Sequence, residues 1–122
     1  MKSFEAVILI GHGSKARGFD RPMKRVAAAL RRGVPGPVRC AYLEINAPSI
    51  PEAIGQAVRR GAREVRLVPY FVLSGRHVTR HIPQIVREEK KRYGKKVRIT
   101  LCPYLGYDSR IVGVVKDRLR RG

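Results

Sequence analysis

Histidine is the residue type whose placement in this sequence points most directly to chemistry. The apolar run Ala6–Ile10 predicts a buried strand, and His12 follows it between two glycines. Glu44 closes a second apolar segment, while His77 and His81 lie beyond a third. Imidazole and carboxylate groups suit a divalent first-row metal ion, and neutral imidazole also acts as a base near pH 7. All three histidines are therefore candidate metal ligands.

The elements that must position these residues alternate between strand and helix. The apolar segments 6–10, 38–45, 64–68 and 96–101 predict strands, and apolar residues at helical spacing predict helices after each of them. This alternation is typical of a parallel sheet. We expect residues 1–122 to form a single α/β domain of three layers, a four-stranded parallel sheet flanked by helices. Ligands bind beyond the carboxyl ends of strands in such folds, where the histidines are predicted to lie.

Two helix starts carry capping signals. Asp20 precedes Pro22 and is a candidate N-cap for the first helix, whose apolar residues begin at Met23. Ser49 and Glu52 have the spacing of a capping box at the start of the second helix. Beyond the fourth strand, Ile111 opens the apolar pattern of a last helix.

The chain has 27 Lys and Arg residues but only 9 Asp and Glu residues, which gives a net charge of +18. A positive field of this strength attracts polyanions and therefore predicts a polyanionic partner. Such a partner is a nucleic acid or a small ligand with many carboxylates or phosphates. The basic clusters lie before glycines or at the chain end, where cations suit helix ends, and aromatic residues do not interleave with them. This pattern disfavours nucleic acid.

The cellular setting predicted from the sequence is the cytoplasm. No apolar run approaches the roughly 18 residues that span a bilayer, which predicts no membrane partner. The first residues lead straight into a strand and leave no room for a signal peptide. Cys40 and Cys102 lack a CxxC spacing, so we expect two free thiols, buried in strands.

Three ordered motifs resemble the sirohydrochlorin chelatases of cobalamin, sirohaem and coenzyme F430 synthesis. They are Ile10–Ser14, Tyr42–Glu44 with Pro48–Ile50, and Val68–Val78 followed by Ile82–Pro83. The resemblance covers nearly the whole chain. The resemblance is greatest to the short archaeal form, whose chain is a single chelatase-like domain. Two subunits of that form together do what two fused halves do in the longer class II chelatases.

The resemblance implies insertion of Co²⁺ or Ni²⁺ into a metal-free tetrapyrrole without ATP and without a permanently bound cofactor. It implies that His12 and His77 are the metal-handling pair and that Glu44 steers the metal or takes a proton. Two other readings stay open: insertion of ferrous iron for sirohaem, and a carrier that holds a tetrapyrrole or metal without catalysis.

The implied substrate, sirohydrochlorin, carries eight carboxylates, which gives the positive charge a specific use. Cationic residues beside the predicted crevice are candidates to steer and hold it, with small residues in the same loops. The candidate substrate-binding residues are Ser14, Lys15, Arg17, Ser74, Gly75, Arg76 and Arg80. A flat macrocycle is better enclosed by two copies of one crevice, so we expect a homodimer.

His81 departs from the family pattern, which usually has aspartate before Ile82-Pro83. Loss of that aspartate as an N-cap costs about 1 kcal/mol. Alternatively, His77 and His81 are four residues apart and lie on one face if the stretch is helical, which makes His81 a possible extra ligand. Pro83, however, places the expected helix start near itself.

Overall fold

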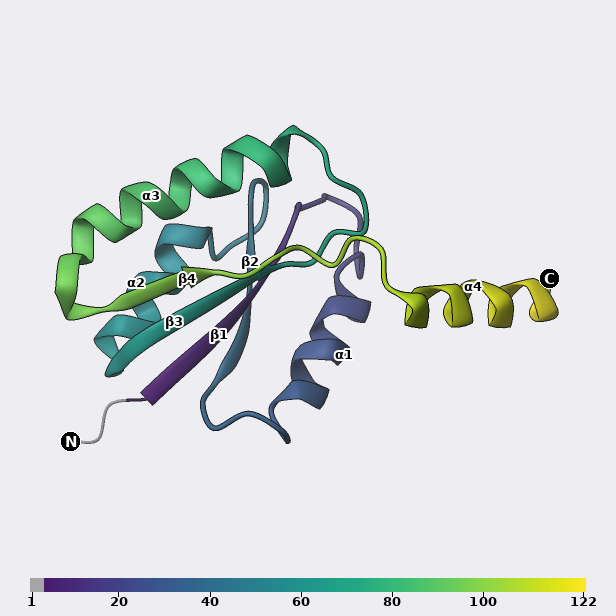
Figure 1. Cartoon of the computed structure of the whole chain (residues 1–122), viewed down its shortest axis with the longest axis horizontal. Helices are drawn as coiled ribbons and strands as arrows, with labels where there is room; N and C mark the ends of the chain where they lie inside the picture. Colours follow the sequence, from purple (N-terminus) through teal and green to yellow (C-terminus); the bar gives the residue numbers. More distant parts are fainter. Residues whose placement is uncertain (1–3) are drawn as a thin grey trace.

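The computed structural model describes residues 4–122, in which strands and helices alternate as predicted (Figure 1). The strands are β1 (Phe4–Gly11), β2 (Val38–Tyr42), β3 (Ala62–Pro69) and β4 (Arg98–Leu101). The helices are α1 (Arg21–Leu30), α2 (Ile50–Arg59), α3 (Ile82–Tyr93) and α4 (Ser109–Arg121), with a π-helical turn at His77–His81 and a 3-10 turn at Gly94–Lys96.

The four strands form one parallel sheet in the order β2-β1-β3-β4, which confirms the predicted fold class. β1 is central because its unbroken apolar run suits a strand covered on both faces. Gly11 pairs with Tyr42 of β2, and Ile10 pairs with Pro69 of β3. The carboxyl ends of these three strands therefore lie side by side.

Two apolar layers enclose the sheet, because alternate residues of β1 point to opposite faces. Ile8 packs with Ile54 of α2 and Ile82 of α3 in the larger core cluster. Leu9 packs with Met23 of α1 in the smaller one. α1 thus lies on the opposite side of the sheet from α2 and α3 (Figure 1).

β2 is shorter than predicted and ends at Tyr42 rather than at Ile45. The N–H groups of Leu43 and Glu44 still donate to the carbonyls of Gly11, the last residue of β1, and of His12. Ile45 has a φ of 70° and turns the chain. Glu44 consequently lies in a loop, not in the strand. β4 likewise begins at Arg98, two residues later than expected, because a 3-10 turn occupies the preceding segment.

The two capping predictions have different outcomes. Ser49 and Glu52 form the reciprocal capping box: the Glu52 N–H donates to Ser49 Oγ at 3.2 Å and the Ser49 N–H donates to Glu52 Oε1 at 2.8 Å. Asp20 occupies the N-cap position of α1 as predicted, but its side chain makes no capping hydrogen bond. Its carboxylate accepts a hydrogen bond from the Tyr42 hydroxyl, which, with Lys24 at 3.2 Å, lowers the pKa of Asp20.

The two cysteines are free, as expected, but only half-buried. Cys40 lies in β2, and burial raises the pKa of its thiol. Cys102 follows the last residue of β4, so the prediction that both lie inside strands is wrong for this residue. Among residues 4–122, no helix is both long and apolar enough to cross a membrane.

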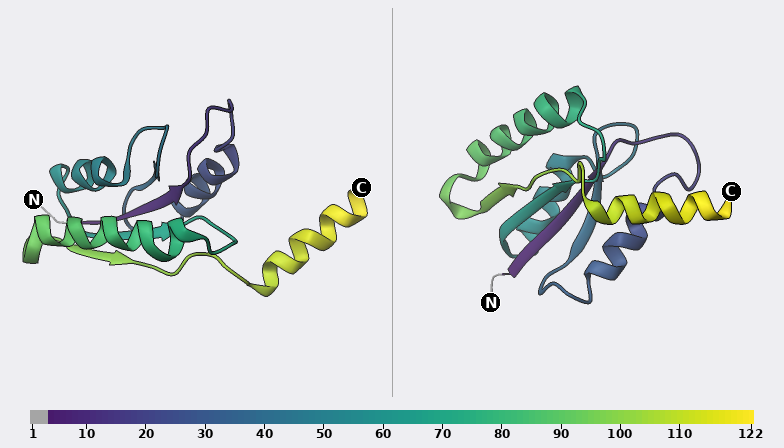
Figure 2. Two further views of the ribbon diagram at one scale, coloured as in Figure 1. Left: turned by 90° about the horizontal axis from the view of Figure 1, so that it is seen from above. Right: turned by 45° about the vertical axis from the view of Figure 1, so that its right-hand side comes forward.

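The last helix, α4, does not cover the sheet. The segment after β4 leads the chain away from the body, and α4 projects from it in Figure 1 and in the left view of Figure 2. None of its residues is buried. The flanking layers are therefore built by α1, α2 and α3.

Candidate metal-binding site

His12 is positioned by the end of β1 and the turn that follows it. Gly13 has a φ of +113°, a conformation that favours glycine. A Cβ atom at this position would lie 1.9 Å from the carbonyl oxygen of Glu44. The loop after β1 therefore passes directly against the loop after β2, which brings His12 close to Glu44.

Backbone hydrogen bonds tie these two loops together. The Leu43 N–H donates to the Gly11 carbonyl at 3.0 Å, and the Glu44 N–H donates to the His12 carbonyl at 3.1 Å. The Asn46 side chain adds a third link, since its Oδ1 accepts from the Ser14 N–H at 2.7 Å. This role of Asn46 was not predicted from the sequence, where its only signal is a polar side chain two residues after Glu44.

His77 comes from the loop that follows β3. The Tyr70 N–H donates to the Ile10 carbonyl at 2.8 Å, which fixes the start of this loop against β1. The chain then enters the π-helical turn, where the N–H groups of Val78 and Thr79 donate to the Gly75 carbonyl. This turn directs the first of its two histidines toward His12.

His12, Glu44 and His77 form a group whose ligand atoms all lie within 4.8 Å of one another. Nε2 of His12 lies 3.3 Å from Nε2 of His77 and 2.9 Å from Oε1 of Glu44. Two ligand atoms of one ion lie at most about 4 Å apart at the bond length of about 2 Å typical of imidazole and carboxylate ligands. The two contacts of His12 meet this limit, and the remaining pair needs at most a small side-chain movement to close around an ion. All three residues are exposed, so an ion or a large ligand can reach the group from solvent.

His81 lies on the other side of the His77 ring. Nδ1 of His81 is 3.2 Å from Nδ1 of His77, whereas His77 faces His12 through Nε2. His81 does not belong to the three-residue group. The expected helix start near Pro83 is only partly right, because the π-helical turn runs into α3 without a break and His81 makes no side-chain cap.

Four candidate cations lie close in sequence to the two ligating histidines, in the loop after β1 and in the segment from 76 to 80 after β3. Lys15, Arg17, Arg76 and Arg80 are exposed, and none of them forms an ion pair with another residue of the described range 4–122. These charges are therefore free to meet an anionic ligand.

The small residues among the candidates differ in burial. Ser14 is half-buried, and its Oγ accepts a hydrogen bond from the Ala16 N–H at 3.0 Å. Such a hydrogen bond is typical of a serine in a turn. Ser74 and Gly75 are exposed on the loop before the π-helical turn. The structure thus places all three in loops beside the histidines.

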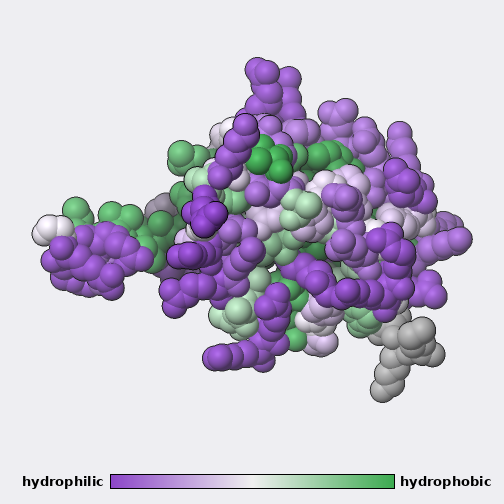
Figure 3. Space-filling model, turned by 180° about the vertical axis from the view of Figure 1, so that it is seen from behind, coloured by the Kyte–Doolittle hydropathy of each residue, from purple (hydrophilic) through white to green (hydrophobic). Residues whose placement is uncertain are grey.

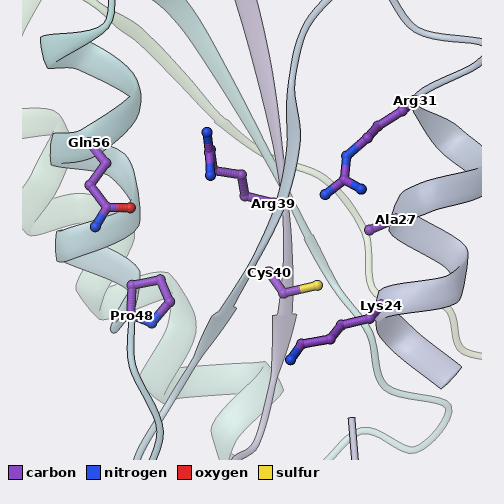
Figure 4. Close-up of a pocket in the computed structure, with 7 residues that line it drawn as sticks. All are labelled: Lys24, Ala27, Arg31, Arg39, Cys40, Pro48 and Gln56. Carbon is purple, nitrogen blue, oxygen red and sulfur yellow. The ribbon is translucent and has the colours of Figure 1, made fainter. Parts of the chain in front are cut away.

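A hollow of about 290 Å³ adjoins His12. Its lining is largely apolar and includes Phe19, Met23 and Tyr70. A second pocket, drawn in Figure 4, contains none of the histidines. Its Arg31 already donates to the Val38 carbonyl, and its Lys24 already pairs with Asp20. The first hollow is therefore the one that belongs to the metal-ligating group.

A parallel α/β sheet with imidazole and carboxylate ligands converging at its carboxyl edge defines a class of metal-handling proteins. Within that class, the family model CbiX matches residues 6–122, and the chain belongs to the CbiX family. A sirohydrochlorin cobaltochelatase of Sulfolobus acidocaldarius is 32% identical over 115 residues, 94% of this chain and 89% of the relative.

Two longer proteins are also similar. The chloroplastic sirohydrochlorin ferrochelatase of Arabidopsis thaliana is 27% identical over 95% of this chain and 52% of its own length. The structure of the sirohydrochlorin chelatase SirB from Bacillus subtilis in complex with cobalt aligns with a TM-score of 0.85 and 25% identity, over 96% of this chain and 50% of that one. This chain therefore spans about half of each of these two proteins.

Proposed function

We propose that this protein is a sirohydrochlorin chelatase that inserts Co²⁺ into the metal-free ring without ATP. The observation that carries the proposal is the exposed group of His12, Glu44 and His77, with Nε2 of the two histidines 3.3 Å apart. The similarity to archaeal cobaltochelatases supports the choice of reaction and of metal.

Metal insertion requires the ion to lose part of its water shell and the ring to lose two pyrrole protons. His12 and His77 replace water on the ion while leaving its open side toward the ring nitrogens. Glu44 lies within hydrogen-bond distance of His12 and accepts a proton or holds the ion in place. Because the metal is a substrate, exposed ligands suit this function better than a closed cage.

The free cations are proposed to hold the substrate's carboxylates. We expect Arg76→Gln and Arg80→Gln each to raise KM for sirohydrochlorin about two- to fivefold with little change in kcat, as for exposed ion pairs. Steady-state kinetics at two salt concentrations measures this effect, which added salt should diminish. Arg60→Gln removes one charge at the exposed end of α2 and should leave KM unchanged. An equal KM in all three variants would contradict this role.

His81 is expected to orient His77 rather than to bind the ion, since its ring faces the Nδ1 side of His77. His81→Asp keeps a hydrogen-bond acceptor there and should leave Co²⁺ affinity unchanged. His81→Ala removes the acceptor and should weaken binding about tenfold or more. Calorimetric titration with Co²⁺ distinguishes the two hypotheses, because an extra ligand predicts a comparable loss in both variants.

Three finer points belong to the same proposal: Ni²⁺ as a second metal, a cytoplasmic location and a homodimer as the working unit. Fe²⁺ is the alternative metal, and the Arabidopsis ferrochelatase is the observation that favours it. The alternative from a different class of function is a carrier that binds the tetrapyrrole or the metal without catalysing insertion.

An anaerobic absorbance time course of sirohydrochlorin with Co²⁺, Ni²⁺ and Fe²⁺ tests the proposal. We expect faster spectral conversion than in the protein-free control, with Co²⁺ fastest. Fastest conversion with Fe²⁺ would establish a ferrochelatase instead. A spectral shift on mixing without acceleration would establish a carrier.

A further inference from the structure

Ile45 lies in a strained turn beside the metal-ligating group. Among residues 4–122, it is the only residue other than glycine with a positive φ, 70°. The Asn46 N–H donates to the Glu44 carbonyl across it at 2.7 Å. A hydrogen bond between residues two apart, around a positive φ, is the mark of the rare and strained form of the γ-turn. A β-branched side chain crowds the backbone in this conformation, so the side chain of Ile45 disfavours the turn that it occupies.

The turn itself does not require isoleucine. Both residues that flank Ile45 are bound to the loop after β1. The Glu44 N–H donates to the His12 carbonyl at 3.1 Å, and Asn46 Oδ1 accepts from the Ser14 N–H at 2.7 Å. Glycine at position 45 would form the same turn without strain. The need to join the two loops therefore explains the backbone at this position but not its side chain.

Core packing does not explain the side chain either. Ile45 is 61% exposed and belongs to neither core cluster, whereas Leu43 packs against the larger one. Hydrophilic side chains predominate on the face of the molecule drawn in Figure 3. A single exposed apolar residue on such a surface needs no explanation. A strained one that gains no core contact does, and strained residues cluster where ligands bind.

The position of Ile45 is that of a residue beneath the rim of a ring ligand. Its neighbour Glu44 places Oε1 at 2.9 Å from Nε2 of His12. A tetrapyrrole is wider than the metal-ligating group, so a ring centred on the ion extends over the residues beside the ligands. The faces of the ring are apolar, and its carboxylates lie at the periphery. The hollow beside His12 is lined by apolar side chains but by none from the loop after β2, where Ile45 lies.

We propose that Ile45 is a substrate-binding residue whose exposed side chain packs on one face of the tetrapyrrole ring. The inference rests on the proposed function and deepens it, because it adds an apolar contact with the ring to the ionic contacts with the carboxylates. The strained turn holds the side chain in place before the ligand arrives. Such preorganisation lowers the entropy that is lost on binding.

A ring ligand explains Ile45 better than a protein partner does. A stable protein interface buries about 800 Å² on each partner. Within residues 27–71, Ile45 is the only large apolar side chain that is exposed. An apolar residue without exposed apolar neighbours along the chain suits contact with one small, flat face.

Titration of the protein with metal-free sirohydrochlorin, followed by absorbance, measures binding of the ring separately from metallation. Ile45→Gly and Ile45→Asn remove the apolar side chain, and both new residues accept a positive φ. Each should weaken binding about five- to twentyfold, the loss expected when an isoleucine side chain is no longer covered. Added salt should not diminish this loss, in contrast to the effect of the arginine variants, because the contact is apolar.

Three controls separate this contact from a structural role. Ile45→Leu keeps an apolar side chain and should bind sirohydrochlorin nearly as the wild type does. Val26→Ala truncates another exposed apolar residue, on α1, and should leave binding unchanged. Ile45→Gly should bind Co²⁺ alone with wild-type affinity. It should also unfold near the wild-type temperature, because relief of strain offsets the greater freedom of glycine in the unfolded chain.

Equal sirohydrochlorin affinity of the wild type and Ile45→Gly would overturn the inference and leave the chelatase proposal standing. An equal loss of Co²⁺ affinity in Ile45→Gly would also overturn it, because Ile45 would then act through Glu44. If Ile45→Gly does not fold, the comparison of Ile45→Asn with Ile45→Leu carries the same test. A wild type that binds the ring without faster metallation would contradict the chelatase proposal alone, and a wild type that does not bind the ring would overturn both.

Discussion

Replacing His12 or His77 with alanine is expected to lower the rate of Co²⁺ insertion into sirohydrochlorin at least about 100-fold, the lower range for loss of a positioned acid or base. Each change also removes one of the two nitrogens that lie 3.3 Å apart. One imidazole and Glu44 then remain to displace water from the ion. The measurement is the anaerobic absorbance time course at equal protein concentration.

Both histidines are exposed, so their replacement should leave the free energy of unfolding nearly unchanged. Thermal unfolding of each variant checks this point. Gln84→Ala removes another exposed polar side chain close to the same π-helical turn and should retain the wild-type rate. Retention of half the wild-type rate by either histidine variant would remove that residue from the proposed mechanism.

The convergence of His12, Glu44 and His77 could be predicted because it depends only on strand order and direction. Each residue follows a different parallel strand, and the carboxyl ends of neighbouring parallel strands lie at one edge. The burial of β1 on both faces could be predicted from its unbroken apolar run. These features follow from local hydrophobicity and the rules of chain connection.

Features set by contacts between loops could not be predicted. β2 ends at Tyr42 because Ile45 turns the chain, although Leu43 and Ile45 extend the apolar pattern of the strand. Asp20 is the N-cap residue that its neighbours predict, but its carboxylate accepts a hydrogen bond from the Tyr42 hydroxyl on another element and not from the helix backbone. Tertiary contacts override the local preference in both cases.

The path of α4 was equally hidden from the sequence. Its apolar pattern predicts a helix packed on its own sheet, and periodicity does not reveal the direction in which the chain leaves β4. The π-helical turn was hidden for a different reason. Pro83 predicts a helix start near itself, whereas the chain is already helical at His77.

Gly13→Ala is expected to have the largest effect among changes outside the ligating side chains. Alanine at a φ of +113° is strained by about 1–3 kcal/mol. Its Cβ would also lie 1.9 Å from the Glu44 carbonyl oxygen, so one of the two loops must move. Movement of either loop separates Glu44 from His12. We expect a lower melting temperature, weaker Co²⁺ binding and loss of metallation, measured by thermal unfolding, calorimetry and absorbance.

Gly33→Ala is the matched control, because a Cβ there would meet only the Leu30 carbonyl oxygen at 3.9 Å, an ordinary contact. It should leave stability, Co²⁺ binding and metallation close to those of the wild type. A Gly13→Ala protein that is destabilised but binds Co²⁺ normally would show that the two loops tolerate separation. The contact between the loops would then serve folding alone, and the position of Glu44 would not depend on the close approach at Gly13.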